Sequence, residues 1–324
     1  MTRQLGRSGI EVSDIGIGTW AIGGEFHSGA QPLGWGDVDD EESIRAIRRA
    51  LDLGVTLLDT SNAYGAGHAE QVIRRAIDGR RDEVVIATKW GYTFAPGTRE
   101  MVGEDGSVPH ARTSLLGSLE RLGTDYVDVF QLHLGGLDST AASELFAACE
   151  QFIDEGLIRT YGWSTDEQSS AELLARTNRG AVVQHTLNVL NDAPELLAVC
   201  ERSGLASLNR SPLAMGLLTA KVTAASTFGA DDVRGREPEW LRWFTDGRAT
   251  PEFLRRRDAI REILSSDGRS LAQGALAWNL ARSPLAIPIP GVRTVAQVEE
   301  NAGVLAKPPL RAEQVAEIHD LLAS

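Results

Sequence analysis

The 324-residue chain contains little cysteine, fewer basic than acidic residues and no long apolar run. Cys149 and Cys200 each lie in an apolar helical pattern, so a disulfide framework is not indicated and a reducing compartment is expected. The 32 basic and 45 acidic residues give a formal net charge of −13, which argues against general binding to nucleic acid or to an anionic membrane. No apolar stretch approaches the ~20 residues of a membrane helix, and no charged leader precedes an apolar segment. We therefore expect a cytoplasmic protein.

Two common ligand-binding patterns are missing as well. No Gly-x-Gly-x-x-Gly run follows an expected strand, so a Rossmann site is not the mode of nucleotide binding. The histidines His68, His110, His185 and His319 have no cysteine or carboxylate at metal-ligand spacing, so we expect no metal site.

Helical and strand patterns alternate along the chain about eight times, which is the α/β pattern of a (β/α)8 TIM barrel. With 42% hydrophobic residues, residues 1–324 can form one domain around a large core. The expected strands are 14–20, 55–59, 83–88, 126–132, 158–163, 181–184, 205–208 and 285–289. The expected helices are 39–53, 69–77, 113–122, 144–155, 171–177, 194–202 and 271–282. Residues 3–12 predict an N-terminal β-hairpin that caps one end of the barrel, and 91–109 and 220–252 predict long loops at the active edge.

Three of the expected strands end on side chains that can hold or move a proton. Asp59 closes one apolar run and is followed by Tyr64, while Lys89 and His133 follow two others. Taken singly, Asp59 would be a turn cap and Tyr64 a packed ring, but the carboxyl ends of parallel neighbours converge on one point. An adjacent ammonium pulls the pKa of a phenol down from ~10, so Tyr64 becomes a usable general acid. His133 could then orient a carbonyl oxygen by a hydrogen bond.

In their order and spacing these residues resemble the aldo-keto reductase family. The matching stretches are Asp59-Thr60-Ser61-Asn62-Ala63-Tyr64-Gly65, Thr88-Lys89 and Gln131-Leu132-His133, and the similarity continues nearly to the C-terminus. By this resemblance, the catalytic tetrad is Asp59, Tyr64, Lys89 and His133. The implied function is reduction of a small aldehyde or ketone, with a sugar-like carbonyl among the candidates, to an alcohol by hydride transfer from NADPH. A monomer is the family expectation, and a small homo-oligomer stays open.

The same resemblance implies that NADPH (or NADP+) lies extended across the mouth of the barrel. Ser164 and Gln184 would hold the carboxamide, residues 211–216 would run along the pyrophosphate, and Glu300 and Asn301 would meet the adenine. The whole expected cofactor set is Gly18, Thr19, Trp20, Asp59, Ser164, Thr165, Gln184, Arg210, Ser211, Pro212, Leu213, Gly216, Pro290, Gly291, Arg293, Gln297, Glu300 and Asn301.

Some positions depart from the family pattern. Arg210 stands where many members have an aromatic residue that stacks on the nicotinamide, and Thr165 stands where an Asn is common. A planar guanidinium can also stack on a ring, while its charge can shift cofactor affinity or potential. After His133 the chain has Leu134-Gly135-Gly136 instead of the usual bulky or proline-containing turn, which leaves the width of the substrate pocket open.

The choice between NADP and NAD depends on the segment near residue 293. Gly291 and Gln297 stand where some members place a Lys and an Arg on the 2′-phosphate, yet Arg293 between them can supply a charge-assisted contact. This favours NADPH without excluding NADH. Alternatively, Arg293 is a solvated residue at a helix start, since Thr294 reads as an N-cap.

Two other classes of function remain open at this point. Lys89 at a strand end could form a Schiff base in a lyase. The barrel could also be a nucleotide-sensing regulatory homologue with little turnover, as some members of the family are.

Overall fold

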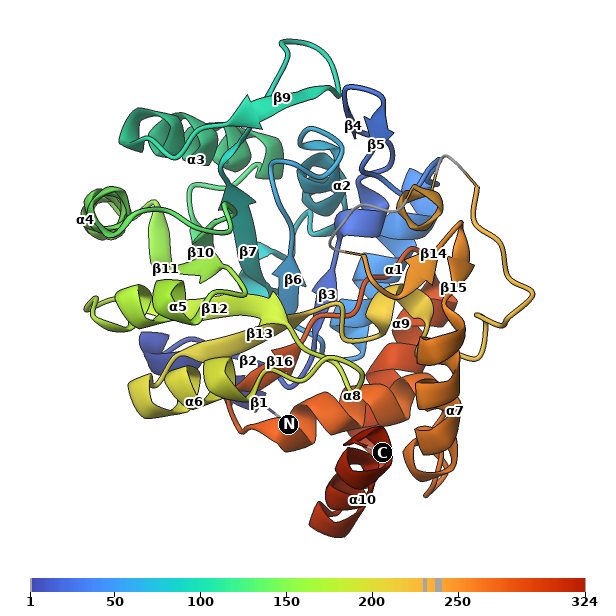
Figure 1. The fold of residues 1–324 in the computed structure, drawn as a ribbon. Coiled ribbons are helices and arrows are strands. Elements are labelled where there is room, and N and C mark those ends of the chain that lie inside the picture. Colours follow the sequence, from blue (N-terminus) through green and yellow to red (C-terminus); the bar gives the residue numbers. More distant parts are fainter. Residues whose placement is uncertain (1, 230–231, 237–240, 324) are drawn as a thin grey trace.

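The computed structural model describes residues 2–229, 232–236 and 241–323. Within these residues, eight parallel strands pair in the order of the sequence. They are β3 (Gly16–Gly18), β6 (Leu57–Asp59), β7 (Val85–Trp90), β10 (Val127–Leu132), β11 (Ile158–Ser164), β12 (Gly180–Thr186), β13 (Ala206–Arg210) and β16 (Ala286–Pro288). A parallel bridge between Gly18 and Gly291 joins the first strand to the segment after the last. The predicted (β/α)8 barrel is therefore confirmed, with the strands at the centre of the molecule (Figure 1).

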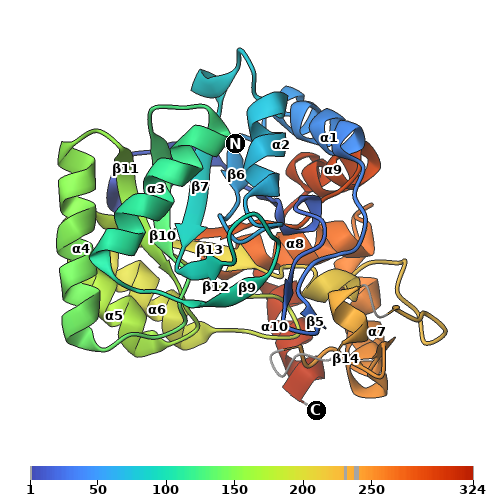
Figure 2. The same cartoon turned by 90° about the horizontal axis from the view of Figure 1, so that it is seen from above.

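The helices surround these strands, as a view turned by 90° also shows (Figure 2). The α-helices are α1 (Asp40–Asp52), α2 (His68–Ala76), α3 (Val108–Leu122), α4 (Ser139–Asp154), α5 (Gln168–Ala175), α6 (Pro194–Ser203), α7 (Pro251–Leu264), α8 (Leu271–Arg282), α9 (Val295–Ala302) and α10 (Ala312–Ala323). Short 3-10 helices lie at η1 (Gly6–Ser8), η2 (Trp20–Ile22), η3 (Arg81–Glu83), η4 (Ala214–Gly216), η5 (Val233–Gly235) and η6 (Gly303–Ala306). Among the described helices none is long and apolar enough to cross a membrane.

Two helices begin five residues earlier than the sequence pattern predicted. Helix α3 starts at Val108 instead of residue 113, because the Ser107 side chain accepts a hydrogen bond from the amide of His110. Helix α4 starts at Ser139 instead of residue 144, because the Asp138 carboxylate accepts bonds from two amides of the first turn. In both cases the capped first turn precedes the apolar periodicity.

The N-terminal hairpin closes one end of the barrel, as predicted. Strands β1 (Thr2–Gln4) and β2 (Glu11–Ser13) pair antiparallel, and Leu5 and Val12 join the apolar cluster that fills the barrel. Gly6 has a φ of +53°, and a Cβ there would lie 2.4 Å from the amide nitrogen of Ala206. Only glycine allows this turn to lie so close to the strands.

Inside the barrel, the side chains change from apolar to polar towards the carboxyl ends of the strands. Alternate residues of a strand face the same side, and the interior cluster includes Leu57, Ala87, Val129, Val182 and Leu208. Two residues beyond these lie Asp59, Lys89, Gln131, Gln184 and Arg210. The carboxyl end of the barrel is thus a polar layer on an apolar base, which is where chemistry is placed in this fold.

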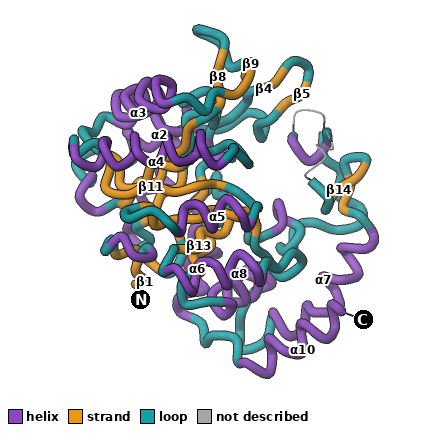
Figure 3. The backbone as a smooth tube through the Cα atoms, turned by 60° about the vertical axis from the view of Figure 1, so that its left-hand side comes forward, coloured by secondary structure: helices purple, strands orange, loops and turns teal. Residues whose placement is uncertain are grey.

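The long connections at this end contain structure of their own. The 91–109 stretch, predicted as a loop, forms the hairpin β8 (Tyr92–Phe94) and β9 (Met101–Glu104). It lies beside the hairpin β4 (His27–Ser28) and β5 (Gln31–Pro32), to which a bridge between His27 and Glu100 joins it (Figure 3).

The 220–252 stretch contains the short hairpin β14 (Phe244–Thr245) and β15 (Arg248–Ala249).

Cys149 and Cys200 are both buried and free, which agrees with the expectation that they form no disulfide.

Candidate active site

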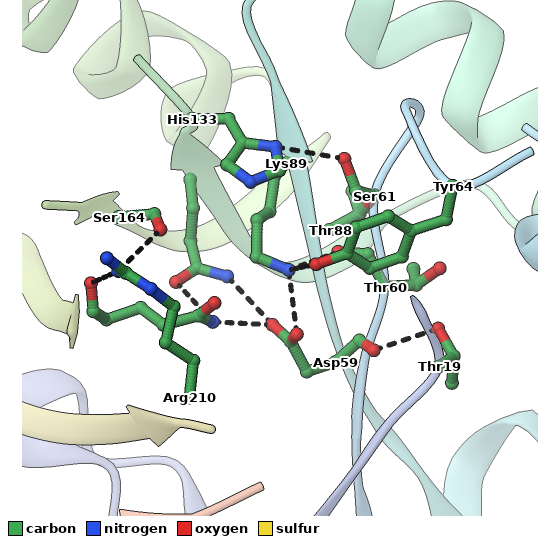
Figure 4. Close-up of polar contacts among 12 residues, drawn as sticks. Thr19, Asp59, Thr60, Ser61, Tyr64, Thr88, Lys89, His133, Ser164 and Arg210 are labelled. Carbon is green, nitrogen blue, oxygen red and sulfur yellow. Dashed lines mark hydrogen bonds and ion pairs between the residues drawn. The ribbon is translucent and has the colours of Figure 1, made fainter. Parts of the chain in front are cut away.

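Lys89 lies at the centre of the four residues that the strand ends predicted. Its Nζ is 2.7 Å from Asp59 Oδ2, 2.7 Å from the carbonyl oxygen of Thr60 and 3.0 Å from the hydroxyl of Tyr64 (Figure 4). Lys89 is 0% and Asp59 2% exposed, whereas Tyr64 and His133 are only partly buried. The ion pair is therefore shielded from solvent, whereas the phenol and the imidazole are partly exposed to it.

The position of Tyr64 depends on a close contact between two backbone segments. Gly65 has a φ of +63°, and a Cβ there would lie 2.0 Å from the carbonyl oxygen of Gly23. A side chain at either glycine would push the loops apart. The ring of Trp20 stacks on Tyr64 at a centroid distance of 6.3 Å.

The Asp59 carboxylate has donors on both oxygens. Oδ2 accepts from Lys89, while Oδ1 accepts from Gln184 Nε2 at 2.7 Å and from Gln131 Nε2 at 3.3 Å. The hydroxyl of Thr19 also donates to the Asp59 carbonyl at 2.9 Å. These contacts fix the carboxylate that faces the ammonium. Gln131 belongs to the Gln131-Leu132-His133 stretch, but the sequence predicted no role for it. Its amide contacts a partner 72 residues away, and no local pattern indicates such a contact.

Burial raises the pKa of Tyr64, and the charge of Lys89 offsets only part of that rise. The expected net lowering of this pKa by Lys89 is therefore wrong for this state of the protein, because removing the phenol from water disfavours the phenolate more than the ammonium favours it. Burial lowers the pKa of Lys89, but Asp59 and Tyr64 raise it to a net value above the usual one. At neutral pH the site thus holds a protonated phenol beside an ammonium.

His133 is a neutral imidazole at the opening. Burial, and then the charges of Lys89 and Arg210, hold its pKa well below the usual value. Its Nδ1 lies 3.2 Å from the hydroxyl of Ser61. When Ser61 donates to Nδ1, the ring proton is on Nε2, where it can bond an acceptor oxygen. The ring also meets Tyr92 edge-on, with centroids 5.1 Å apart.

The residues expected at the nicotinamide lie next to these four. Arg210, the last residue of β13, has Nη1 3.2 Å from the carbonyl oxygen of Gln184 and 3.5 Å from the hydroxyl of Ser164. Its Nη2 pairs with Asp166, an exposed residue that sequence reasoning missed. Thr165 is buried and its hydroxyl donates to the carbonyl oxygen of Gly135 at 2.6 Å, so this hydroxyl braces the turn after the strand of His133.

The segment that follows Arg210 has an unusual backbone. The structure describes all of 211–216, and φ is +53° at Ser211, +46° at Ala214, +55° at Met215 and +93° at Gly216. Left-handed φ values at non-glycine residues are strained and persist where neighbouring contacts hold them. Backbone concavities of this kind present N–H groups to anions. In this segment the amides of Ala214 and Gly216 already donate to the carbonyl oxygens of Ser211 and Leu213, so an anion would be met by the remaining N–H groups.

Side chains from distant segments hold this backbone in place. Asn188 Nδ2 donates to the carbonyl oxygen of Ser211 at 3.0 Å, and Arg234 Nη1 donates to that of Met215 at 3.2 Å. The Arg234 guanidinium also lies 3.8 Å from the ring centroid of Phe228 and 4.8 Å from that of Trp35. The long insertion and the 21–38 loop therefore meet above the strained segment. Pro212 is buried and Leu213 partly buried there.

The segment expected at the adenosine end begins against the first strand. Gly18 donates its amide to Pro290 at 3.0 Å, and a Cβ at Gly18 would lie 2.9 Å from the carbonyl oxygen of Ile289. Gly291 pairs with Gly18 and is exposed. Further on, Asn301 is 3% exposed and Glu300 is exposed.

Arg293 and Gln297 have partners within the protein. Arg293 donates to the backbone carbonyls of Trp35 and Asp37, so it fastens the 21–38 loop to the start of α9. Gln297 Oε1 accepts the amides of Arg293 at 2.7 Å and of Thr294 at 3.3 Å in a capping box. Thr294 is thus the N-cap, and contact of Arg293 with a phosphate would use its remaining N–H groups.

Glu70 is a buried charge that the sequence reasoning overlooked. Its carboxylate accepts from the hydroxyl of Thr88 at 2.6 Å and from Arg121 Nε at 2.6 Å. Because Thr88 precedes Lys89, this network ties the strand of Lys89 to α2 and α3. The sequence does contain one indication of its role, since Glu70 is a carboxylate on the otherwise apolar face of α2. In the described part of the chain no group of three His, Cys, Asp or Glu side chains could hold a metal.

Comparison with known proteins gives the following similarities. The family model described as "Aldo/keto reductase family" matches residues 14–323. The aldo-keto reductase YhdN of Bacillus subtilis is 31% identical over 314 residues, which cover 91% of this chain and 86% of that protein. The structure of the glycerol dehydrogenase of Gluconobacter oxydans has a TM-score of 0.84 at 28% identity, covering 99% of this chain and 95% of that one. An aldo-keto reductase from Klebsiella pneumoniae, solved in complex with NADPH, has a TM-score of 0.71 at 26% identity with the same coverage.

Proposed function

The chain belongs to the aldo/keto reductase family, and from that premise we propose that it reduces an aldehyde or ketone to an alcohol with NADPH as hydride donor. The observation that carries this proposal is the position of Lys89. Its ammonium contacts both the buried carboxylate of Asp59 and the hydroxyl of Tyr64, so a proton can leave the phenol beside a fixed positive charge.

The residues at the mouth fit a nicotinamide nucleotide. The left-handed segment 211–216 offers an anion-binding backbone for a pyrophosphate. Ser164 and Arg210 lie beside it, next to the four proton-handling residues, and would hold the nicotinamide end. When bound there, the nicotinamide supplies or accepts the hydride.

In the proposed reaction the protein supplies the proton and the binding site of the carbonyl oxygen. Tyr64 gives its proton to that oxygen as negative charge develops, and the ammonium of Lys89 stabilises the phenolate that remains. Asp59 keeps Lys89 charged, and the Nε2–H of His133 donates to the same oxygen. In the reverse direction the Tyr64 phenolate is the base that takes the proton of an alcohol.

The surroundings of Lys89 argue against the Schiff-base alternative. A lysine that attacks a carbonyl must be a free amine, but Lys89 is fully buried and bonded to three oxygens. Its pKa is above the usual value, since Asp59 and Tyr64 outweigh the effect of burial. The ammonium therefore persists, as the reductase mechanism needs.

The cofactor and the reaction can be tested together. The purified protein is titrated with NADPH and with NADH while the fluorescence of its seven tryptophans is followed, and a panel of aldehydes and ketones is then added while the absorbance of the reduced cofactor is recorded. We expect tighter binding of NADPH and oxidation of the cofactor that depends on a carbonyl.

Each other outcome has a defined meaning. Binding without turnover over a broad panel would favour the regulatory homologue. Binding of neither nucleotide would overturn the cofactor proposal. Arg293→Ala should weaken NADPH more than NADH if this residue contacts the 2′-phosphate, and equal weakening of both would leave Arg293 with only its contacts to Trp35 and Asp37.

A further inference from the structure

Arg210 places a cation beside the proton-handling residues. The guanidinium has two sides with different partners, because Nη1 points to Ser164 and to the carbonyl of Gln184 while Nη2 pairs with Asp166. Figure 4 shows Arg210 on the same side of the site as Ser164. Asp166 is exposed to solvent, so the counter-charge lies on the outer side of the guanidinium.

The charge of Arg210 reaches the reacting groups. It contributes to lowering the pKa of His133, after burial and Lys89. It also partly offsets the raised pKa of Tyr64, in which burial is the largest cause. The charge of Arg210 therefore acts on both residues even though Asp166 pairs with it.

The following step rests on the function proposed above. The left-handed segment that fits a pyrophosphate begins at Ser211, directly after Arg210. A dinucleotide whose pyrophosphate lies on that segment must direct its nicotinamide either towards Tyr64 or away from it, and only the first allows hydride transfer. Arg210 and Ser164, which lie next to each other and are proposed to hold the nicotinamide end, would then be beside the ring.

We propose that Arg210 makes the site bind the reduced nicotinamide more tightly than the oxidised one. The oxidised ring is a cation and the reduced ring is neutral, so the guanidinium repels one and not the other. The phosphates and the adenosine are identical in both forms, so their interactions cancel in the ratio of the two dissociation constants. Through its charge, Arg210 would thus favour binding of the reduced cofactor over the oxidised one.

The consequence is a higher reduction potential of the bound cofactor. If the oxidised form binds ten times more weakly than the reduced form, a two-electron couple shifts by about 30 mV. The bound cofactor then accepts a hydride more readily than the free one. Arg210 thus moves the balance on the protein towards oxidation of the alcohol.

The test measures the dissociation constants of NADPH and of NADP+ by tryptophan fluorescence and compares their ratio between variants. Arg210→Met keeps most of the aliphatic stem and removes the charge, so the preference for NADPH should fall about tenfold, the effect of a charge that its partner and solvent screen in part. Arg210→Lys keeps the charge and should retain most of the preference. Asp166→Asn removes the counter-charge and should increase the preference severalfold.

An unchanged ratio of the two dissociation constants in Arg210→Met would overturn the inference. If both nucleotides bind more weakly by the same factor, Arg210 acts by stacking or packing without discrimination of charge. If the protein prefers NADH, the same ratio is measured with NADH and NAD+. Failure of the wild type to bind any of these nucleotides would instead overturn the proposed function itself.

Discussion

Replacing Lys89 by methionine tests whether the centre of the site is a coupled pair of charges. The change removes the ammonium and keeps most of the side-chain volume. Asp59 is 2% exposed and would keep only the amides of Gln184 and Gln131, at 2.7 Å and 3.3 Å, on one of its oxygens. The carbonyl of Thr60 would also lose the donor that lies 2.7 Å away.

The magnitude follows from the burial of the pair. Removing one member of a buried ion pair leaves an uncompensated charge and costs about 3–5 kcal/mol of unfolding free energy. Asp59→Asn should cost a similar amount, since it strands the ammonium. The double variant has neither charge and should be more stable than either single variant.

Urea unfolding at neutral pH, followed by tryptophan fluorescence, measures all four proteins. Lowering the pH should reduce the difference in unfolding free energy between Lys89→Met and the wild type. In that variant the folded state takes up a proton on the stranded carboxylate more readily than the unfolded state, so its stability falls as pH rises. Small losses that simply add in the double variant would refute the coupled pair.

Three further results are expected from buried or shifted groups. Burial lowers the pKa of His185 to about 4 against ~6.5 in the unfolded chain. As the pH falls, the unfolded state therefore binds a proton first, and the free energy of unfolding should drop by about 2 kcal/mol between pH 8 and pH 5. Urea unfolding of His185→Gln over the same range should lack this drop. Burial raises the pKa of Cys149 and Cys200 to about 12, so neither should react with a thiol reagent at about pH 8 until urea is added, and rapid labelling of either in the native protein would contradict their burial. Because burial holds the pKa of His133 below and that of Tyr64 above the usual value, kcat for reduction should stay level from about pH 6 to pH 9, and an inflection near the usual pKa of histidine would count against a neutral imidazole.

The strand ends could be predicted from the sequence because their signal is local. An apolar run that stops on Asp59, or leads into Lys89 or His133, predicts a buried strand with a polar side chain at its end, and this prediction does not depend on distant residues. Helix α8 was predicted with its observed bounds, Leu271–Arg282, since its apolar pattern begins directly at its cap. Parallel order then brings the strand ends together.

Features that depend on partners far apart in the sequence could not be predicted in this way. The hairpin β8–β9 arises from backbone pairing across a turn rich in polar residues. The pairing of Arg210 with Asp166 and of Glu70 with Arg121 joins residues 44 and 51 positions apart. Whether the pKa of Tyr64 is raised or lowered depends on how deeply the phenol is buried. Composition and residue spacing do not indicate that depth.

The most direct test of the central claim is a single turnover with Tyr64→Phe. The variant and the wild type are loaded with NADPH and mixed rapidly with a carbonyl compound that the wild type reduces, and the loss of reduced cofactor is timed. We expect the rate of hydride transfer to fall about 10²–10⁴-fold, while the dissociation constant of NADPH changes little because the phenol is not among the proposed cofactor contacts. Transfer at close to the wild-type rate would contradict the assignment of Tyr64 as the proton donor.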